Sequence, residues 1–407
     1  MRVTVAMDSW KGSLTSLNAG NAVKAVVLRA APEAYVSVCP MADGGEGTAK
    51  TLVQAMGGRM EQITVTGPMG EPVCCSYGIW KDGVTAVMEM AAAAGITLVE
   101  QGKRNPMHAT TYGVGEMIRD AVLKGCRRFI IGIGGSATND GGVGMLQALG
   151  FRFLDSDGRP VPFGALGLKT LASVTEGEAL GALSECEFRI ACDVANVLCG
   201  PQGASAVYGP QKGATRQMTE QMDLWMKRYA KLVQRLYPGA DPNRAGAGAA
   251  GGLGFAFLSF LKARLEPGVQ IVLEETGLAE RIKDADLVIT GEGRLDGQTA
   301  MGKVPAGVAA LAKRYQKPVV ALAGSVSLGA VQGREMGIDA SFPVLREVIT
   351  LEEAMEPERA KKNIADTAEQ VASLFLAGRE TEAGYKRGKI EQTMDRKAFS
   401  AEKRGTR

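Results

Sequence analysis

RVTVAMDSWKGSLTSLNAGNAVKAVVLRAAPEAYVSVCP, residues 2–40, is the stretch that decides the fold. An apolar run at Val3–Met7 predicts a short buried strand, and the spacing of apolar residues over 17–31 predicts a helix after it. A second strand is predicted at Tyr35–Cys39, just beyond Pro32, a residue that cannot continue a helix. Strand, helix and strand in this order predict a βαβ unit, and therefore a parallel sheet.

The same pattern returns near the other end of the chain. Asp286–Thr290 (DLVIT) predicts a buried strand, Pro305–Arg314 a helix with proline in its first turn, and Pro318–Ala323 another strand. Because βαβ crossovers are almost always right-handed, the turns after these strands should share one edge of a parallel sheet, where doubly wound proteins bind ligands. We therefore predict that residues 1–65 and 285–378 build one discontinuous domain.

Residues 66–284 have a different pattern. The alternating runs Val73–Trp80 and Val84–Met88 are separated by an Asp-Gly turn signal and predict a hairpin. An apolar run at Arg128–Ile133 leads through a glycine-rich turn into a predicted helix at Gly144–Leu149. This mixture predicts an inserted α+β domain. The last segment, 379–407, is polar and charged without sustained apolar periodicity, which predicts a flexible tail.

Composition narrows the class of protein. The chain has 53 glycines among 407 residues and only 5% aromatic residues, which favours an α/β protein with many tight turns. The net charge of +3 is small, and residues 380–407 alone carry eight Lys/Arg against five Asp/Glu. The rest of the chain is therefore neutral, which argues against nucleic acid as a partner.

Cysteine usage and the N-terminus bear on location. The seven cysteines form no C-x-x-C pair and have one histidine, His108, to assist them, so structural zinc is not expected. Cysteines within apolar runs are typical of reduced thiols in an intracellular protein. The N-terminal apolar run reaches Asp8 too early for a signal peptide, and no run has membrane-spanning length. These features predict a cytoplasmic protein that binds no membrane.

Three glycine-rich stretches match phosphate-binding patterns in their letters. Gly246–Gly251 fits G-x-G-x-x-G but follows a polar loop, not the strand that a dinucleotide site needs. Gly297–Val304 fits a P-loop except that Val304 replaces the hydroxyl residue that binds magnesium, although Lys303 is a cation beside a helix N-terminus. Gly132–Ala137 follows a predicted strand and is the best case for a nicotinamide cofactor, with Asp155 near the distance expected for a ribose ligand. Against this, the polar loop continues to Gly142 and suits phosphate better.

Charged residues follow the predicted strands of the discontinuous domain. Carboxylates occur at Asp8, at Asp43 and Glu46, and at Glu292 and Asp296. They predict either magnesium ligation or orientation of a substrate hydroxyl, with helix capping as the structural alternative. Lys11 and Arg294 lie in two of the same turns and could neutralise a carboxylate or phosphoryl group, and Asp193 ends an apolar run three residues before Asn196. A serine hydrolase is not expected, because no G-x-S-x-G elbow accompanies the single histidine.

Seven sequence blocks occur in one order along the chain: Asp8–Leu14, Met41–Thr48, Gly132–Gly142, Asp193–Asn196 with Gly200–Ala204, Tyr208–Gly213, Gly246–Gly254 and Thr290–Lys303. Taken together, they resemble the bacterial glycerate 2-kinase family (glycerate kinase type 1). The resemblance runs from about residue 1 to 378. It implies an α/β fold with two α/β domains, a Rossmann-like or flavodoxin-like parallel-sheet domain interrupted by an inserted mixed α+β domain. It also implies phosphorylation of D-glycerate to 2-phosphoglycerate with ATP and Mg²⁺, in a cleft between the domains.

Roles within this chemistry follow from charge type and turn position. We expect Asp193 to orient or deprotonate the acceptor hydroxyl, with Lys11 and Arg294 as the other catalytic residues. The expected substrate-binding residues are Ser9, Asn196 and Asp8. The expected nucleotide- or phosphate-binding residues are Gly134, Gly135, Ser136, Thr138, Asn139 and Lys303. The expected metal ligands are Asp43, Glu292 and Asp296.

Two other functions stay open at this point. A nicotinamide-dependent oxidoreductase of a small hydroxy acid would use the Gly132 turn, and a nucleotide- or metabolite-binding protein without turnover would use the charged turns for recognition alone. The residues themselves do not choose between the 2- and 3-hydroxyl of glycerate; the resemblance favours the 2-position. They also leave open a homo-oligomer.

Overall fold

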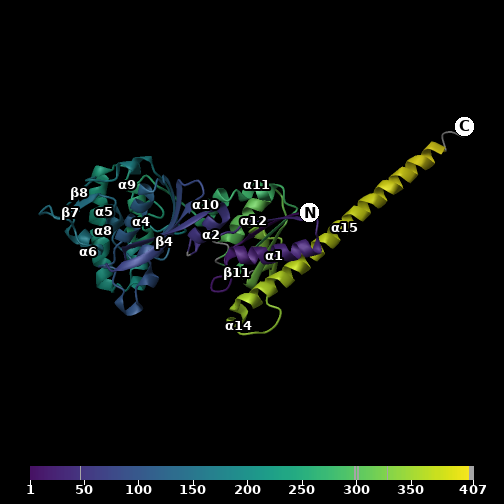
Figure 1. The fold of residues 1–407 in the computed structure, drawn as a ribbon, viewed down its shortest axis with the longest axis horizontal. Helices are drawn as coiled ribbons and strands as arrows, with labels where there is room; N and C mark the ends of the chain where they lie inside the picture. The colour runs from purple at the N-terminus through teal and green to yellow at the C-terminus, as the bar shows by residue number, and fades with distance from the viewer. Residues whose placement is uncertain (46, 298, 300–301, 328, 403–407) are drawn as a thin grey trace.

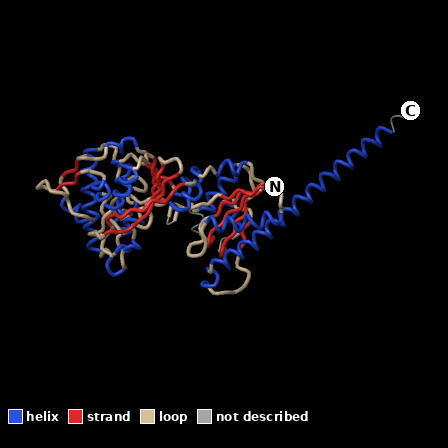
Figure 2. The backbone as a smooth tube through the Cα atoms, in the orientation of Figure 1, coloured by secondary structure: helices blue, strands red, loops and turns tan. Residues whose placement is uncertain are grey.

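The computed structural model describes residues 1–402 except 46, 298, 300–301 and 328. It contains two large sheets that lie beside each other, and one long helix that projects away from them (Figures 1 and 2). Within the described residues, no helix is long and apolar enough to cross a membrane.

The first sheet is built from both ends of the chain. Its five strands are all parallel, in the order β13-β12-β11-β1-β2. This is the flavodoxin-like order, and the direction of winding changes between β1 and β11. The strands are β1 (Arg2–Met7), β2 (Tyr35–Val38), β11 (Leu287–Leu295), β12 (Val319–Val326) and β13 (Ala340–Pro343).

The second sheet is mixed. Its order is β10-β9-β6-β5-β4-β3, in which the pairs β3–β4 and β4–β5 are antiparallel and the other pairs are parallel. The strands are β3 (Gly58–Thr66), β4 (Pro72–Trp80), β5 (Thr85–Glu89), β6 (Arg128–Gly132), β9 (Glu187–Ala191) and β10 (Arg264–Glu266). A separate antiparallel pair is formed by β7 (Arg152–Leu154) and β8 (Ser173–Thr175).

Helices cover both faces of the two sheets. Those of the terminal regions are α1 (Ser16–Ala30), α2 (Thr48–Met56), α10 (Gly268–Glu275), α11 (Leu278–Lys283), α12 (Val304–Arg314), α13 (Ala330–Glu335), α14 (Leu351–Met355) and α15 (Pro357–Glu402). Those of the middle are α3 (Ala91–Ala94), α4 (Tyr112–Leu123), α5 (Val143–Ala148), α6 (Ala165–Thr170), α7 (Ala204–Tyr208), α8 (Arg216–Leu236) and α9 (Ala249–Phe260). Short 3₁₀ turns lie at Ile96–Leu98, Gln101–Lys103, Gly181–Glu185 and Pro210–Lys212.

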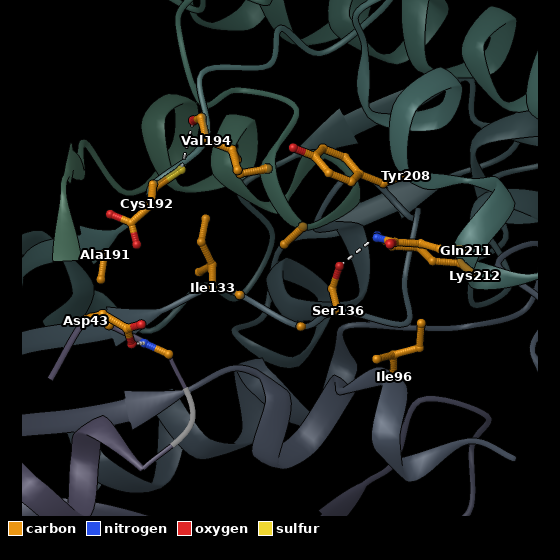
Figure 3. A pocket seen from close by; sticks show the side chains of 17 residues that line it. Asp43, Ile96, Ile133, Ser136, Ala191, Cys192, Val194, Tyr208, Gln211 and Lys212 are labelled. Atoms are coloured by element: carbon orange, nitrogen blue, oxygen red, sulfur yellow. Dashed lines mark hydrogen bonds between the residues drawn. The ribbon is translucent and has the colours of Figure 1, made fainter. Parts of the chain in front are cut away.

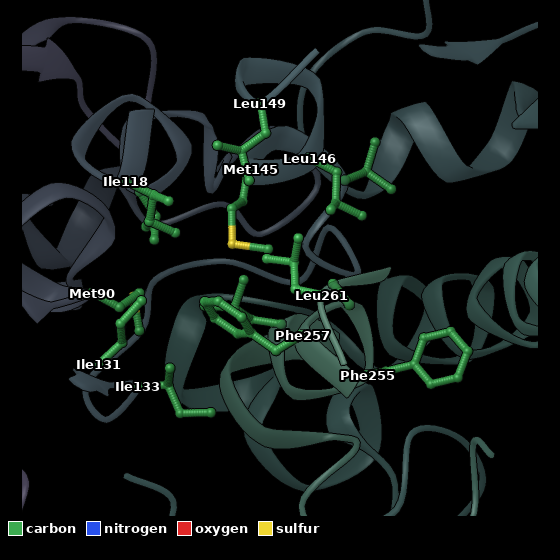
Figure 4. Close-up of a cluster of buried hydrophobic side chains, with 14 of the residues drawn as sticks. Met90, Ile118, Ile131, Ile133, Met145, Leu146, Leu149, Phe255, Phe257 and Leu261 are labelled. Carbon is green, nitrogen blue, oxygen red and sulfur yellow. The ribbon is translucent and has the colours of Figure 1, made fainter. Parts of the chain in front are cut away.

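The layers between the sheets form one apolar cluster. Helices α2 and α10 contact the six-stranded sheet, and α10 also contacts α12. Buried side chains of this cluster come from both sheets, for example Val87 and Ile130 from one and Val288 and Ala321 from the other. The far face of the six-stranded sheet has its own core, in which Phe257 lies beside Met145 (Figure 4). Burying apolar surface is the main driving force of folding, so this shared cluster holds the two sheets together.

The predicted βαβ unit and hairpin are confirmed. Thr15 caps α1 by accepting a hydrogen bond from the Asn18 amide, and Gly78 of β4 lies opposite Val87 of β5. The strand predicted to end at Thr290 continues to Leu295 as β11, because it stays paired with β12 as far as Leu295.

Two elements run across the predicted domain boundaries, which stay predictions. Residue 65 lies inside β3, because pairing with β4 begins already at Gly58. Residues 379–402, predicted to be part of a flexible tail, belong to α15, which ends at Glu402. Residues 403–407 lie outside the described residues.

Candidate functional site

The carboxyl ends of β1, β2 and β11 bring charged side chains together. Met7 pairs with Gly291 across the two strands, so Asp8 and Glu292 follow at the same level of the sheet. They line a pocket with Asp43, which comes from the turn after β2. We call it the switch-point pocket, because it lies where the sheet changes its direction of winding. Its other charged lining residues are Lys11, Arg294 and Lys303.

Two carboxyl groups of this pocket are buried. Burial and, second, the negative charge of Asp43 raise the pKa of Asp8 to about 7. The Ser9 amide donates a hydrogen bond to Asp8 Oδ1 over 2.6 Å, which acts to lower this pKa. Burial also raises the pKa of Glu292, although the Thr299 hydroxyl donates to Glu292 Oε1 over 2.6 Å. A positive ligand in this pocket would favour the ionised form of both groups.

The cations of the pocket have carboxylate partners. Lys11 Nζ lies 3.3 Å from Asp43 Oδ2, and Lys303 Nζ lies 3.8 Å from Glu292 Oε2. Arg294 Nε lies 3.3 Å from Asp296 Oδ2, and Asp296 is not among the residues that line the pocket. The predicted site residues after β1, β2 and β11 are therefore together, with Asp296 set at the side.

A second pocket lies at the carboxyl ends of β6 and β9 in the other sheet. We call it the glycine-loop pocket; Gly134, Gly135 and Ser136 form one wall and Asp193 another. Figure 3 shows Tyr208 and Lys212 on one side of it and Asp43 on the other. Asp43 thus lines both pockets.

Asp193 and Asn196 follow β9. The amide of Gly268, at the start of α10, donates to Asp193 Oδ1 over 2.9 Å. Burial, and secondarily the charge of Asp43, raise the pKa of the Asp193 carboxyl. Asn196 does not line the pocket, whereas Tyr208 does. Asn196 Oδ1 accepts a hydrogen bond of 2.6 Å from the Tyr208 hydroxyl.

The structure divides the residues predicted to bind phosphate. Gly134, Gly135 and Ser136 line the glycine-loop pocket, whereas Lys303 lines the switch-point pocket. Thr138 and Asn139 are fully buried beneath the loop and line neither pocket, and Asn139 Nδ2 donates to Ser205 Oγ over 2.8 Å. Glu46 and residues 298, 300 and 301 of the P-loop-like stretch lie outside the described residues.

Sequence reasoning missed Lys212. Its side chain is 2% exposed, and Nζ donates to Ser136 Oγ and to the Thr138 carbonyl oxygen, each over 2.7 Å (Figure 3). Burial lowers its pKa to about 7, with Asp140 acting weakly in the opposite direction. A lysine between Pro210 and Gly213 is typical of an exposed turn. The one sequence feature that pointed to Lys212 was its place in Tyr208–Gly213, a block that resembles the family.

A metal ion would need ligands from the switch-point pocket. In the described part of the chain, no group of three or more His, Cys, Asp or Glu side chains is arranged to hold one. The predicted set of Asp43, Glu292 and Asp296 is therefore not a ready-made cage, and Asp296 pairs with Arg294. Asp43 and Glu292 do offer carboxylate oxygens to one pocket, which fits Mg²⁺, because this ion usually takes one or two carboxylates and completes its shell with water and phosphate.

Charged pockets at the carboxyl ends of parallel strands are typical of α/β enzymes that act on small molecules. Comparison with known proteins identifies the family. A model of the glycerate kinase family matches residues 3–376. Glycerate kinase from Haemophilus influenzae is 45% identical, over 92% of this chain and 99% of that protein. Glycerate 2-kinase from Escherichia coli is also 45% identical, over 90% of this chain and 98% of that protein.

A comparison with solved structures agrees with the sequence matches. A crystal structure from Salmonella typhimurium LT2, assigned to glycerate kinase 2, aligns with a TM-score of 0.87 and 46% identity, covering 93% of this chain and 99% of that one. The chain belongs to the glycerate kinase family. Its fold is α/β, with one parallel and one mixed sheet.

Proposed function

We propose that this chain transfers the γ-phosphoryl group of ATP to D-glycerate and releases 2-phospho-D-glycerate and ADP. Membership of the glycerate kinase family supports the reaction, and the relative named glycerate 2-kinase supports the 2-position. One observation carries the proposal. Asp43 lines both pockets, so a donor in one pocket and an acceptor in the other would meet at the same carboxylate.

The proposed step is an in-line displacement. The glycerate hydroxyl oxygen forms a bond to the γ-phosphorus while the bond from that phosphorus to the bridging oxygen of ADP breaks. The hydroxyl proton passes to Asp193. Its raised pKa supports this role, because a more basic carboxylate accepts a proton more readily at neutral pH.

Binding and charge neutralisation complete the mechanism. Lys11, Arg294 and Lys303 would offset the charge of the phosphoryl oxygens from the switch-point pocket. Ser9 and Asp8, predicted from sequence to bind substrate, line the same pocket and would hydrogen-bond the nucleotide substrate there. The Gly134–Ser136 wall would contact the acceptor beside Asp193, and Asn196 would act through the Tyr208 hydroxyl.

We propose Mg²⁺ as the cofactor. Asp43 and Glu292 would hold it, and the ion would supply further positive charge at the phosphate oxygens. Asp296 would bind the ion only after its ion pair with Arg294, in which Nε and Oδ2 lie 3.3 Å apart, has broken.

The test is a coupled assay of ADP release with a panel of hydroxy acids, followed by phosphorus NMR of the product. We expect ADP only with D-glycerate or a close analogue, and a resonance of the 2-phosphate ester. A 3-phosphate resonance would correct the position, and no ADP with any acceptor would refute the kinase. Protection from heat by Mg-ATP but not by NAD separates the kinase from the oxidoreductase, which the comparisons do not support.

The domain division is also proposed. We propose that each sheet with its outer helices is one domain, with the middle of the chain inserted between the two terminal parts, and that ligands bind between the domains. The separate apolar clusters on the outer faces of the two sheets support this division. A cytoplasmic location and a homo-oligomer remain predictions.

A further inference from the structure

The switch-point pocket has two unlike sides. One side carries the charged residues described above. The other side is apolar and comes from Trp10, which follows β1, and from the chain that follows β13, including α14. Its residues are Trp10, Val344, Leu345, Leu351, Ala354 and Met355.

The outer part of this apolar side is open to solvent, whereas Trp10 and Val344 are buried. Leu345 is 37% exposed and Leu351 is 75% exposed, and Val348 in the same segment is exposed as well. Single exposed leucines are common on proteins, but these lie within one short segment at the rim of one pocket. Covering them with a flat apolar ligand group would be favourable.

Two polar atoms beside this side lack partners. Trp10 Nε1 and Ser13 Oγ are buried, and neither forms a hydrogen bond with any of the described residues. Both residues line the switch-point pocket. Buried polar groups are normally hydrogen-bonded, so an N–H donor and a hydroxyl left without partners at a pocket indicate a ligand with polar atoms at that point.

We propose that the apolar side of the switch-point pocket binds the purine and ribose of the nucleotide, and that glycerate binds in the glycine-loop pocket. This inference rests on the proposed function. Glycerate carries an oxygen on each of its three carbons and has no apolar face, whereas an adenosine group has a flat ring and several acceptors. The triphosphate then lies along Lys11, Lys303 and Arg294, and its γ-phosphoryl group reaches Asp43 at the junction with the other pocket.

The direct test is binding of a fluorescent (mant) derivative of ATP without glycerate. Leu351→Asp places a negative charge where the purine would lie, and because Leu351 is exposed the new charge is not buried in the core. We expect the nucleotide Kd to rise about 10- to 100-fold, the equivalent of losing one covered leucine. Leu374→Asp is the matched control, because Leu374 is 70% exposed on α15 and does not line the pocket, so its Kd should equal that of the wild type.

A second variant tests the unpaired indole. Trp10→Phe keeps an aromatic ring and removes the N–H donor, so the nucleotide Kd should rise about 2- to 10-fold, as expected for one hydrogen bond. In steady-state assays both variants should raise the KM for ATP and leave the KM for D-glycerate unchanged.

The outcomes separate this inference from the proposed function. An unchanged nucleotide Kd in Leu351→Asp, or a raised KM for glycerate alone, would overturn the assignment of the two pockets while the kinase itself stands. Failure of the wild type to release ADP with glycerate would refute the kinase. Nucleotide binding that weakens in Leu351→Asp would still support the purine site in that case.

Discussion

Replacing Lys212 by methionine should change how stability depends on pH. The ammonium group is buried, and burial lowers its pKa from 10.5 to about 7. Between these two values the unfolded chain binds one more proton than the folded chain, so the free energy of unfolding rises with pH over this range. A shift of about 3.5 units corresponds to roughly 5 kcal/mol in total.

The change in the free energy of unfolding that can be measured between pH 7 and 9 follows from the same pKa values. Between pH 7 and 9, wild-type stability should increase by about 2 kcal/mol relative to Lys212→Met, since Lys212 is half protonated at the lower pH. Other groups titrate there too; burial raises the pKa of Cys75 to about 12, for example, which lowers stability as pH rises. These contributions are common to both proteins and cancel in the difference.

The assay is urea unfolding followed by tryptophan fluorescence at pH 7, 8 and 9. Trp225 belongs to the same buried cluster as the residues around the glycine loop and reports on that region. Lys231→Met, at an exposed lysine of α8, is the control and should give a difference from wild type that does not change with pH. A flat difference for Lys212→Met as well would refute the reasoning, because it would mean that the buried ammonium titrates as it does in the unfolded chain.

Three further outcomes are expected. Asp193→Asn keeps an oxygen to accept from the Gly268 amide but cannot take a proton, so kcat should fall about 10²- to 10⁴-fold with mant-ATP binding unchanged; near-normal kcat would exclude the base role. Gly132→Ala would put a methyl group 2.4 Å from the Gly44 carbonyl oxygen and should lower stability by about 1–3 kcal/mol in urea unfolding, whereas an unchanged midpoint would mean that the contact is not close. Removing magnesium with EDTA should abolish ADP release reversibly without shifting the melting temperature, because no metal cage occurs among the described side chains; a lower melting temperature would indicate a structural metal.

The charged edge of the five-stranded sheet could be predicted from sequence. Right-handed crossovers place the turns after parallel strands at one edge, whatever the length of chain between them. Asp8 and Glu292 therefore come together although 283 residues lie between them, as the pairing of Met7 with Gly291 requires. The length of β11 could not be predicted in the same way, because glycines at 291 and 293 weaken a strand signal and the pairing that sustains it, such as Arg294 with Ser325, is made by another part of the chain.

The division of the site into two pockets was not accessible from sequence. Lys303 and the loop at Gly134 both carry phosphate-binding signals, and only the packing of one sheet against the other decides that they line different pockets. Which loop residues are buried could not be predicted either, because loops lack the periodic pattern of apolar residues that indicates the buried face of a helix or strand. Asn139 was expected to contact a ligand and is buried against Ser205, whereas Lys212 was not predicted and lines the glycine-loop pocket.

The position of Asp43 follows from how closely the two sheets approach. A methyl group on Gly44 would lie 2.9 Å from the Ala191 side chain and 3.0 Å from the Gly268 backbone, and one on Gly132 would lie 2.4 Å from the Gly44 carbonyl oxygen. The turn after β2 therefore packs with its backbone directly on the ends of β6 and β9, which only glycine at these positions permits. Asp43, the residue before this contact, is held at the boundary of the two pockets by it, and the Gly45 amide fixes its carboxylate with a hydrogen bond of 3.0 Å. This backbone contact and the apolar cluster shared by both sheets therefore hold Asp43 at the junction where a donor in one pocket and an acceptor in the other would meet.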